Sequence, residues 1–260
     1  MPTTYTPQLA AEYQQLFDSC LIKEAKYPEI DSILAKIVAG RARYETIAST
    51  TKVPWYFTGI VHSLECNGKF TTHLHNGDPL TARTVKVPAG FPKTGTPPFT
   101  WEASAIDALK LQKLDQWTDW SLPATLFQLE RYNGFGYRPR GINSPYLWSY
   151  SNHYTKGKFT ADGIFDANAI SKQCGAAVLL RRMSERQLAV IGELDIITQI
   201  KTFGAQVAFA PNTYNGKAEQ LQKLLNRVGL PLRVDGKAGR NTSDAYYSIA
   251  KKYLRGDTKR

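Results

Sequence analysis

The sequence is poor in cysteine and has no long apolar run. Its three cysteines, Cys20, Cys66 and Cys174, are odd in number and widely spaced, which suggests neither a disulfide framework nor a zinc motif. No stretch of about 18 or more apolar residues is present, so we expect no membrane span. The N-terminus lacks the basic start and apolar core of a secretory signal. A reducing cytosol is therefore the expected place of synthesis.

Histidine is also scarce, and this bears on metal chemistry. The four histidines are His62, His73, His75 and His153, and no HExxH motif is present. His73 and His75 on one strand face, with His153 or an acid as third ligand, would be the ligands of a zinc amidase or peptidase. Their spacing matches no zinc hydrolase, so we expect no metal and no cofactor. Sensitivity to EDTA would support the zinc enzyme, and indifference to EDTA would exclude it.

Acidic residues are rare at the C-terminal end. Residues 211–260 carry 11 Lys and Arg against 4 Asp and Glu, a charge of +7 out of +11 for the whole chain. A basic module implies an anionic partner, such as nucleic acid, a membrane surface or an anionic cell wall. Solubility alone is the other explanation.

The length of 260 residues allows one large domain or two, and 42% hydrophobic residues suffice for a sizeable core. Apolar spacing predicts helices over residues 7–20, 28–48, 101–114, 166–183 and 185–202. We expect a mainly α protein with a small β-hairpin, divided into residues 1–200, a linker at 201–215 and a small three-helix domain at 216–260. A monomer is expected.

The stretch from Val53 to Val87 is the most informative. Phe57, Ile60, Val61 and Leu64 recur at helical spacing, with Thr50 or Thr51 as cap and Pro54 in the first turn. Asn67 and Gly68 supply the left-handed residue that ends a helix. This places Glu65 in the last turn, beside the buried face.

Glu65 is predicted to hold its proton more tightly than an ordinary carboxylate. The C-terminal end of a helix carries partial negative charge, and partial burial also disfavours the charged form. A general acid working near neutral pH requires this property. The alternative is a solvated Glu paired with Lys69.

Residues 70–87 alternate in polarity around Asn76-Gly77, which predicts a β-hairpin next to Glu65. Asp78 is the candidate second carboxylate, and its alternative role is to cap the turn. Further on, residues 137–154 form a loop rich in Tyr, Trp, Asn and Ser. Its aromatic side chains either bind sugar rings or anchor the loop to the core, and the sequence leaves both open.

The tail resembles the small three-helix peptidoglycan-binding domain. The residues that carry the resemblance are Leu221-Gln222, Leu225-Asn226, Gly229, the run Val234 to Gly239, Thr242 and Ala245. The match covers about fifty residues and departs only at Arg240-Asn241. Bacterial peptidoglycan is therefore the expected partner, rather than a specific nucleic acid.

Residues 25–185 resemble the lysozyme superfamily, which includes goose-type lysozymes, lytic transglycosylases and phage lysozymes. That fold places an acidic Glu at a helix end next to a β-hairpin, and Tyr132-Asn133 resembles the Tyr-Asn pair of the goose-type and transglycosylase branch. At phage-lysozyme spacing, however, Leu74 stands where the second acid should be. The absent signal peptide and the wall-binding tail together resemble a phage endolysin, held in the host cytoplasm before release to the cell wall or periplasm.

The resemblance implies cleavage of the β-1,4 bond between N-acetylmuramic acid and N-acetylglucosamine. Glu65 would protonate the leaving oxygen, and Asp78, with Thr84, would hold water or stabilise the cationic ring. The residues expected to bind substrate are His73, Tyr132, Asn133, Tyr137 and Trp148. Without a second group to hold water, the enzyme would be a lytic transglycosylase. A non-catalytic protein that binds the wall or nucleic acid is the remaining alternative.

Overall fold

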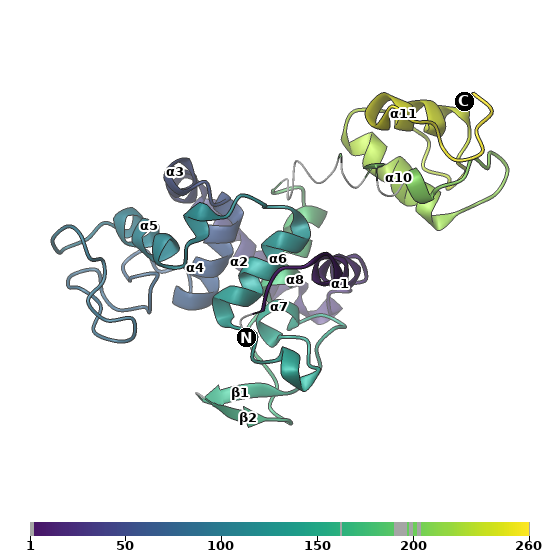
Figure 1. Ribbon diagram of the computed structural model, residues 1–260. Helices are drawn as coiled ribbons and strands as arrows, with labels where there is room; N and C mark the ends of the chain where they lie inside the picture. Colours follow the sequence, from purple (N-terminus) through teal and green to yellow (C-terminus); the bar gives the residue numbers. More distant parts are fainter. Residues whose placement is uncertain (1–2, 162, 190–196, 198–199, 202–203, 260) are drawn as a thin grey trace. The chain divides into compact units, whose positions relative to one another are not determined.

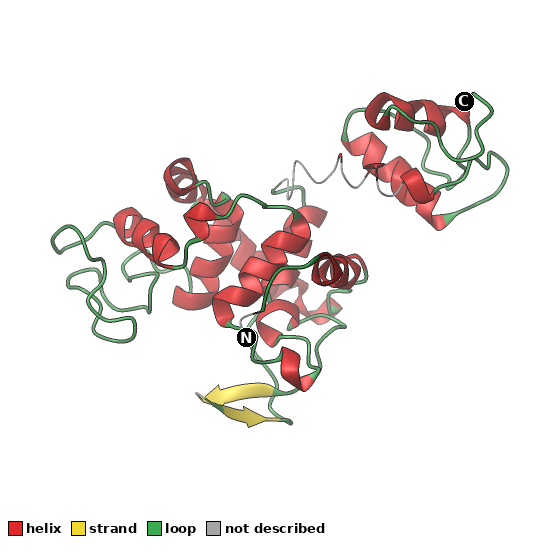
Figure 2. Cartoon of the chain, viewed as in Figure 1, coloured by secondary structure: helices red, strands yellow, loops and turns green. Residues whose placement is uncertain are grey.

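The computed structural model describes residues 3–161, 163–189, 197, 200–201 and 204–259 (Figures 1 and 2). The chain forms two compact units, Met1–Ile191 and Gly192–Arg260. In the first unit, the elements are α1 (Pro7–Asp18), η1 (Glu24–Lys26), α2 (Tyr27–Ala39), α3 (Arg41–Thr51), α4 (Trp55–Cys66), α5 (Trp101–Leu111), η2 (Leu114–Gln116), α6 (Leu122–Asn133), η3 (Arg138–Arg140), α7 (Pro145–Trp148), β1 (Lys158–Ala161), β2 (Ile164–Asp166) and α8 (Ala176–Glu185). In the second unit, α10 (Gly216–Arg227) and α11 (Arg240–Ala250) have defined bounds. The expectation of a mainly helical protein with one small antiparallel sheet is confirmed.

Helix α4 lies at the centre of the first unit and packs against α2, α3, α6 and α8. Its residues from Tyr56 to His62 are all buried, each large apolar side chain among them contributing about 1.5–3 kcal/mol. Gly59 permits the close approach of α2, because a Cβ there would lie 2.7 Å from Cγ2 of Ile37. The helix ends as predicted, with Asn67 at φ 51° and Gly68 at φ 69°. At the other end, Pro54 occupies the N-cap, and the predicted caps Thr50 and Thr51 belong to α3.

The predicted hairpin at residues 70–87 is wrong. This segment lies within a long irregular loop between α4 and α5 (Figure 1), and its only bridge among the described residues joins Thr72 to Pro79. The neighbours His73 and Leu74 are 0% and 1% exposed, whereas a strand would send them to opposite faces. The carboxylate of Asp78 accepts bonds from the N–H groups of Val85 and Lys86, which a partner strand would otherwise use.

The antiparallel sheet of the first unit, β1 with β2, forms instead where the sequence suggested a loop followed by a helix. Phe159 pairs with Phe165 in register, and both rings contact Tyr137. Gly163 at φ 70° lies in the connection. The helix predicted over 166–183 is therefore shorter and begins only at Ala176. The predicted helix at 185–202 falls mostly outside the described residues.

The second unit is organised around a buried glutamine on α10. The side-chain N–H₂ of Gln222 donates to Oδ1 of Asp235, the carbonyl of Lys237 and the hydroxyl of Thr242. Its Oε1 accepts from the backbone N–H groups of Asp235 and Gly236. These hydrogen bonds join α10 to the loop before α11 and to Thr242 in the first turn of α11.

The boundary between the units differs from the predicted one. Val207, placed in the predicted linker, is buried in the core of the second unit, and Tyr246 on α11 donates to the carbonyl of Lys201. The described part of residues 201–215 therefore packs with the second unit. Among the described residues, no helix has both the length and the apolar character needed to cross a membrane.

Replacing Gln222 by Leu is expected to destabilise the second unit by at least about 1–3 kcal/mol, because buried partners of its amide lose their hydrogen bonds. Gln220→Leu is the matched control, since Gln220 lies on the exposed side of the same helix. Backbone hydrogen exchange along α10 should accelerate in the first variant only. Equal exchange in both variants would contradict the role given to Gln222.

Candidate active site

Glu65 lies in the last turn of α4, where the sequence placed it. The hydroxyl of Tyr146, on α7, donates a hydrogen bond of 2.9 Å to its Oε1. Tyr132 at the end of α6 lies close enough for the charge of Glu65 to raise the pKa of its phenol, after the larger effect of burial. Side chains of α6 and α7 thus lie close to the carboxyl group of a residue on α4, which is distant from both in sequence.

Glu65 as a whole is an exposed residue, but the surrounding protein partly desolvates its carboxyl group. This desolvation raises the pKa of Glu65, and the hydrogen bond from Tyr146 opposes the effect without cancelling it. Burial and the charge of Glu65 keep the pKa of Tyr146 well above its usual value, so this phenol is a donor throughout the physiological range. The group therefore combines a solvent-accessible acid with an oriented partner.

The backbone around Glu65 is fixed by its neighbours. The side chain of Gln173 donates 2.7 Å to the carbonyl of Leu64, one of the last carbonyls of α4, which lack helical partners. The thiol of Cys66 donates to the carbonyl of His73 at 3.3 Å, and burial raises the pKa of this thiol to about 11. The loop after α4 is thus anchored one residue beyond Glu65.

The side chains of Asp78 and Thr84 form hydrogen bonds with other groups of the same loop. Oδ2 of Asp78 accepts from Val85, Lys86 and the side chain of Asn76, which holds the pKa of Asp78 below its usual range. The hydroxyl of Thr84 donates to the carbonyl of Pro88 and accepts from the N–H of Phe91. Asp78 is only 4% exposed. These contacts match the turn-capping alternative, and among the described residues neither side chain forms a hydrogen bond or ion pair with Glu65.

The prediction that His73 binds substrate requires correction. Its ring is fully buried, with Nδ1 bonded to the hydroxyl of Ser104 at 2.7 Å and Nε2 to the carbonyl of Ala82 at 2.8 Å. Both nitrogens are therefore occupied, which also removes it from the zinc alternative. No group of three or more His, Cys, Asp or Glu in the described residues is arranged to hold a metal ion.

The other candidates lie in three different places. Tyr132 is half-buried near Glu65, and the adjacent Asn133 is exposed at the end of α6. Tyr137 is buried against the β-hairpin, where its hydroxyl accepts the N–H of Phe159. Trp148 is buried beside a separate cavity lined by α1, α6 and the segment before α7. Both side chains are buried and, among the described residues, neither forms a hydrogen bond with Glu65, so their contacts with substrate stay predictions.

Comparison of the chain with protein-family models, curated proteins and solved structures gives no match. The functional proposal therefore depends on the geometry around Glu65 and on the sequence.

Tyr146 was not assigned to the site from the sequence, although it makes the side-chain hydrogen bond to Glu65. Its position depends on the short helix α7, which begins at Pro145. Pro in the first turn after a Ser is a known helix-start signal, and it was available in the sequence. A Cβ at Gly175 would lie 2.2 Å from the carbonyl oxygen of Leu147, so this glycine lets α8 begin directly against α7.

Proposed function

We propose that the protein is a peptidoglycan hydrolase of the endolysin type, with Glu65 as general acid. The target is the β-1,4 bond between N-acetylmuramic acid and N-acetylglucosamine. The observation that supports it is the carboxyl group of an exposed glutamate at a helix end, with a pKa raised by desolvation and a hydrogen bond from Tyr146. A raised pKa keeps a larger fraction of the acid protonated near neutral pH.

In this mechanism Glu65 donates its proton to the glycosidic oxygen as the bond to the anomeric carbon breaks. A water molecule then adds to that carbon and returns a proton to the Glu65 carboxylate. Tyr146 binds Oε1, so Oε2 is the oxygen that carries the proton to the substrate. When Glu65 becomes a carboxylate, the same hydrogen bond becomes charge-assisted and stabilises it. The basic second unit, with its motif centred on Gln222, supports a wall-binding role.

Lytic transglycosylase activity on the same bond is the second candidate, and the position of Asp78 favours it. The Asp78 carboxylate is buried and held by the N–H groups of its own loop, so it is poorly placed to activate a water. Without a second carboxylate to activate water, the 6-hydroxyl of muramic acid would attack the anomeric carbon and close an anhydro ring. Its proton would pass to the Glu65 carboxylate.

The test is digestion of purified peptidoglycan by the full chain, followed by mass spectrometry of the soluble products. Hydrolysis is expected to give fragments that end in reducing N-acetylmuramic acid. Anhydro-muramic ends, lighter by one water, would assign the transglycosylase reaction instead. Intact glycan strands with cut peptide stems, or no soluble product, would contradict both.

A further inference from the structure

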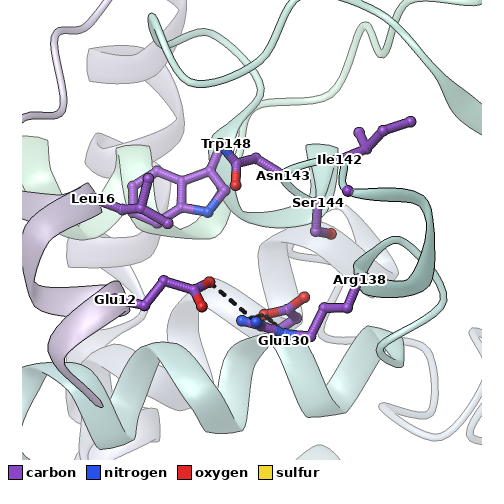
Figure 3. Close-up of a pocket in the computed structure, with 9 residues that line it drawn as sticks. Glu12, Leu16, Glu130, Arg138, Ile142, Asn143, Ser144 and Trp148 are labelled. Atoms are coloured by element: carbon purple, nitrogen blue, oxygen red, sulfur yellow. Dashed lines mark hydrogen bonds and ion pairs between the residues drawn. The ribbon is translucent and has the colours of Figure 1, made fainter. Parts of the chain in front are cut away.

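A polar cavity lies on the first unit, and Glu65 is not among the residues that line it. It has a volume of about 250 Å³ and is lined by Glu12 and Leu16 of α1, Glu130 of α6, and Arg138, Gly141, Ile142, Asn143, Ser144 and Trp148. Figure 3 shows Glu12, Glu130 and Arg138 along one side and Trp148 with Asn143 across from them. A water molecule takes about 30 Å³ of liquid volume, so this space exceeds the needs of one or two waters.

Ser144 is the most unusual residue of this cavity. It stands at the N-cap of α7, where a serine hydroxyl ordinarily accepts an N–H of the first turn, but its side chain makes no such bond. Ser144 is 2% exposed, and its hydroxyl has no hydrogen-bond partner. The side chain points into the space between Trp148 and Arg138 (Figure 3). A buried hydroxyl without a partner costs free energy, which a bound ligand would recover.

The other polar groups offer acceptors rather than donors. Tyr13 and two nitrogens of Arg138, Nε and Nη2, all donate to Oε2 of Glu130, and none of these bonds uses Oε1. Nη1 of Arg138 donates to Oε1 of Glu12 at 3.0 Å, a bond that does not use Oε2. The guanidinium thus directs its donors at the carboxylates, and two carboxylate oxygens remain for a ligand.

The net charge of the cavity narrows the class of ligand that can bind there. Two carboxylates and one guanidinium line it, which leaves a net charge of −1. An anion would be repelled, and a neutral ligand would leave that charge uncompensated. A primary ammonium has three N–H donors, which match the free oxygens of Glu12, Glu130 and Ser144.

We propose that this cavity binds a primary ammonium group carried on a short aliphatic chain. Glu12, which is half-exposed, lies at the entrance, and Glu130 and Ser144 lie in the buried part. The ammonium comes either from a free small molecule or from the diamino acid of a peptidoglycan peptide stem. The binding itself does not depend on glycan cleavage by Glu65.

The test is calorimetric titration of the full chain at low salt with Nα-acetyl-lysine amide. The matched ligand is Nα,Nε-diacetyl-lysine amide, which has the same chain without the charge. The first ligand is expected to bind and the second to show no measurable heat. Equal affinity for both ligands would overturn the proposal, because the ammonium would then not be what the protein recognises. No binding of the charged ligand would also overturn it.

Variants locate the site. Glu12→Gln and Ser144→Ala should each weaken binding, the first by about tenfold because a charge-assisted hydrogen bond is lost. Glu45→Gln is the matched control, because Glu45 lies on α3 in a surface ion pair and has the same 49% side-chain exposure as Glu12. Equal weakening by the Glu45 and Glu12 variants would show a general charge effect and overturn the site.

Soluble peptidoglycan fragments with a free stem amine, compared with the same fragments after acetylation, distinguish the two sources. Competition by the free-amine fragments alone assigns the peptide stem. If the lysine amide binds and neither fragment competes, the ligand is a free small molecule. Both the titration and the competition measure binding, so their results would stand even if the protein did not cleave glycan strands.

Discussion

Replacing Glu65 by Gln is expected to lower the rate of glycan cleavage by about 10²–10⁴-fold, the usual contribution of a general acid. The amide keeps the size of the side chain and can still accept the hydrogen bond from Tyr146, but it has no proton to donate. The measurement is the initial rate of reducing-end release from purified peptidoglycan. Glu45→Gln on the exposed face of α3 should retain the wild-type rate.

The same variant should remain folded, and its stability separates chemistry from structure. Because the folded-state pKa of Glu65 is raised, ionisation of this group at neutral pH opposes folding. Glu65→Gln should therefore be as stable as the wild type or more stable at pH 7. The difference should vanish below about pH 4, where the carboxyl is protonated in both folded and unfolded chains. If the variant is inactive because it is unfolded, its loss of activity does not support Glu65 as the general acid.

The largest expected stability effect concerns the buried pair of Glu130 and Arg138. Glu130 is 3% exposed and accepts the hydroxyl of Tyr13 as well as Arg138. Glu130→Met leaves a largely buried guanidinium and a buried phenol without their acceptor. Loss of one partner from a buried ion pair typically costs about 3–5 kcal/mol.

A double variant tests whether the charge is the cause. Glu130→Met with Arg138→Met removes both charges, and it should recover a substantial part of the lost stability. All five tryptophans lie within residues 1–191, so denaturant unfolding followed by tryptophan fluorescence reports the first unit alone. If the double variant loses as much free energy of unfolding as the two single variants together, the loss arises from packing and not from an unpaired charge.

Local sequence signals were sufficient for α4 and for the position of Glu65. The apolar spacing of its residues and the stop at Asn67-Gly68 act over one or two turns, so the pattern determines the element. The hydrogen bond from Tyr146 joins residues 81 positions apart, and no local pattern encodes such a contact. The sequence therefore predicted the position of Glu65 at the end of its helix, but it did not predict the contact with Tyr146.

The error in the predicted hairpin has a specific cause. The alternation around Asn76-Gly77 has the pattern of a strand pair, but the carboxylate of Asp78 takes the N–H groups of Val85 and Lys86. Side-chain bonds of Asp compete with strand pairing in this way. The residues that do pair, Phe159 and Phe165, are held by contacts with Tyr137 more than twenty residues before them. In the second unit, by contrast, four residues of the predicted motif bond to Gln222, namely Asp235, Gly236, Lys237 and Thr242.

The most direct test compares the protonation of Glu65 with activity. The carboxyl carbon of Glu65 is titrated by NMR, with Glu65→Gln identifying its signal, and kcat/KM for peptidoglycan cleavage is measured over the same pH range. The acid must be protonated to act, so activity should be full below the raised pKa of Glu65 and be lost as the pH rises through it. We predict that the two midpoints coincide, above the ordinary glutamate value of about 4.3. A midpoint at or below that value, or cleavage that persists well above it, would contradict Glu65 as the proton donor.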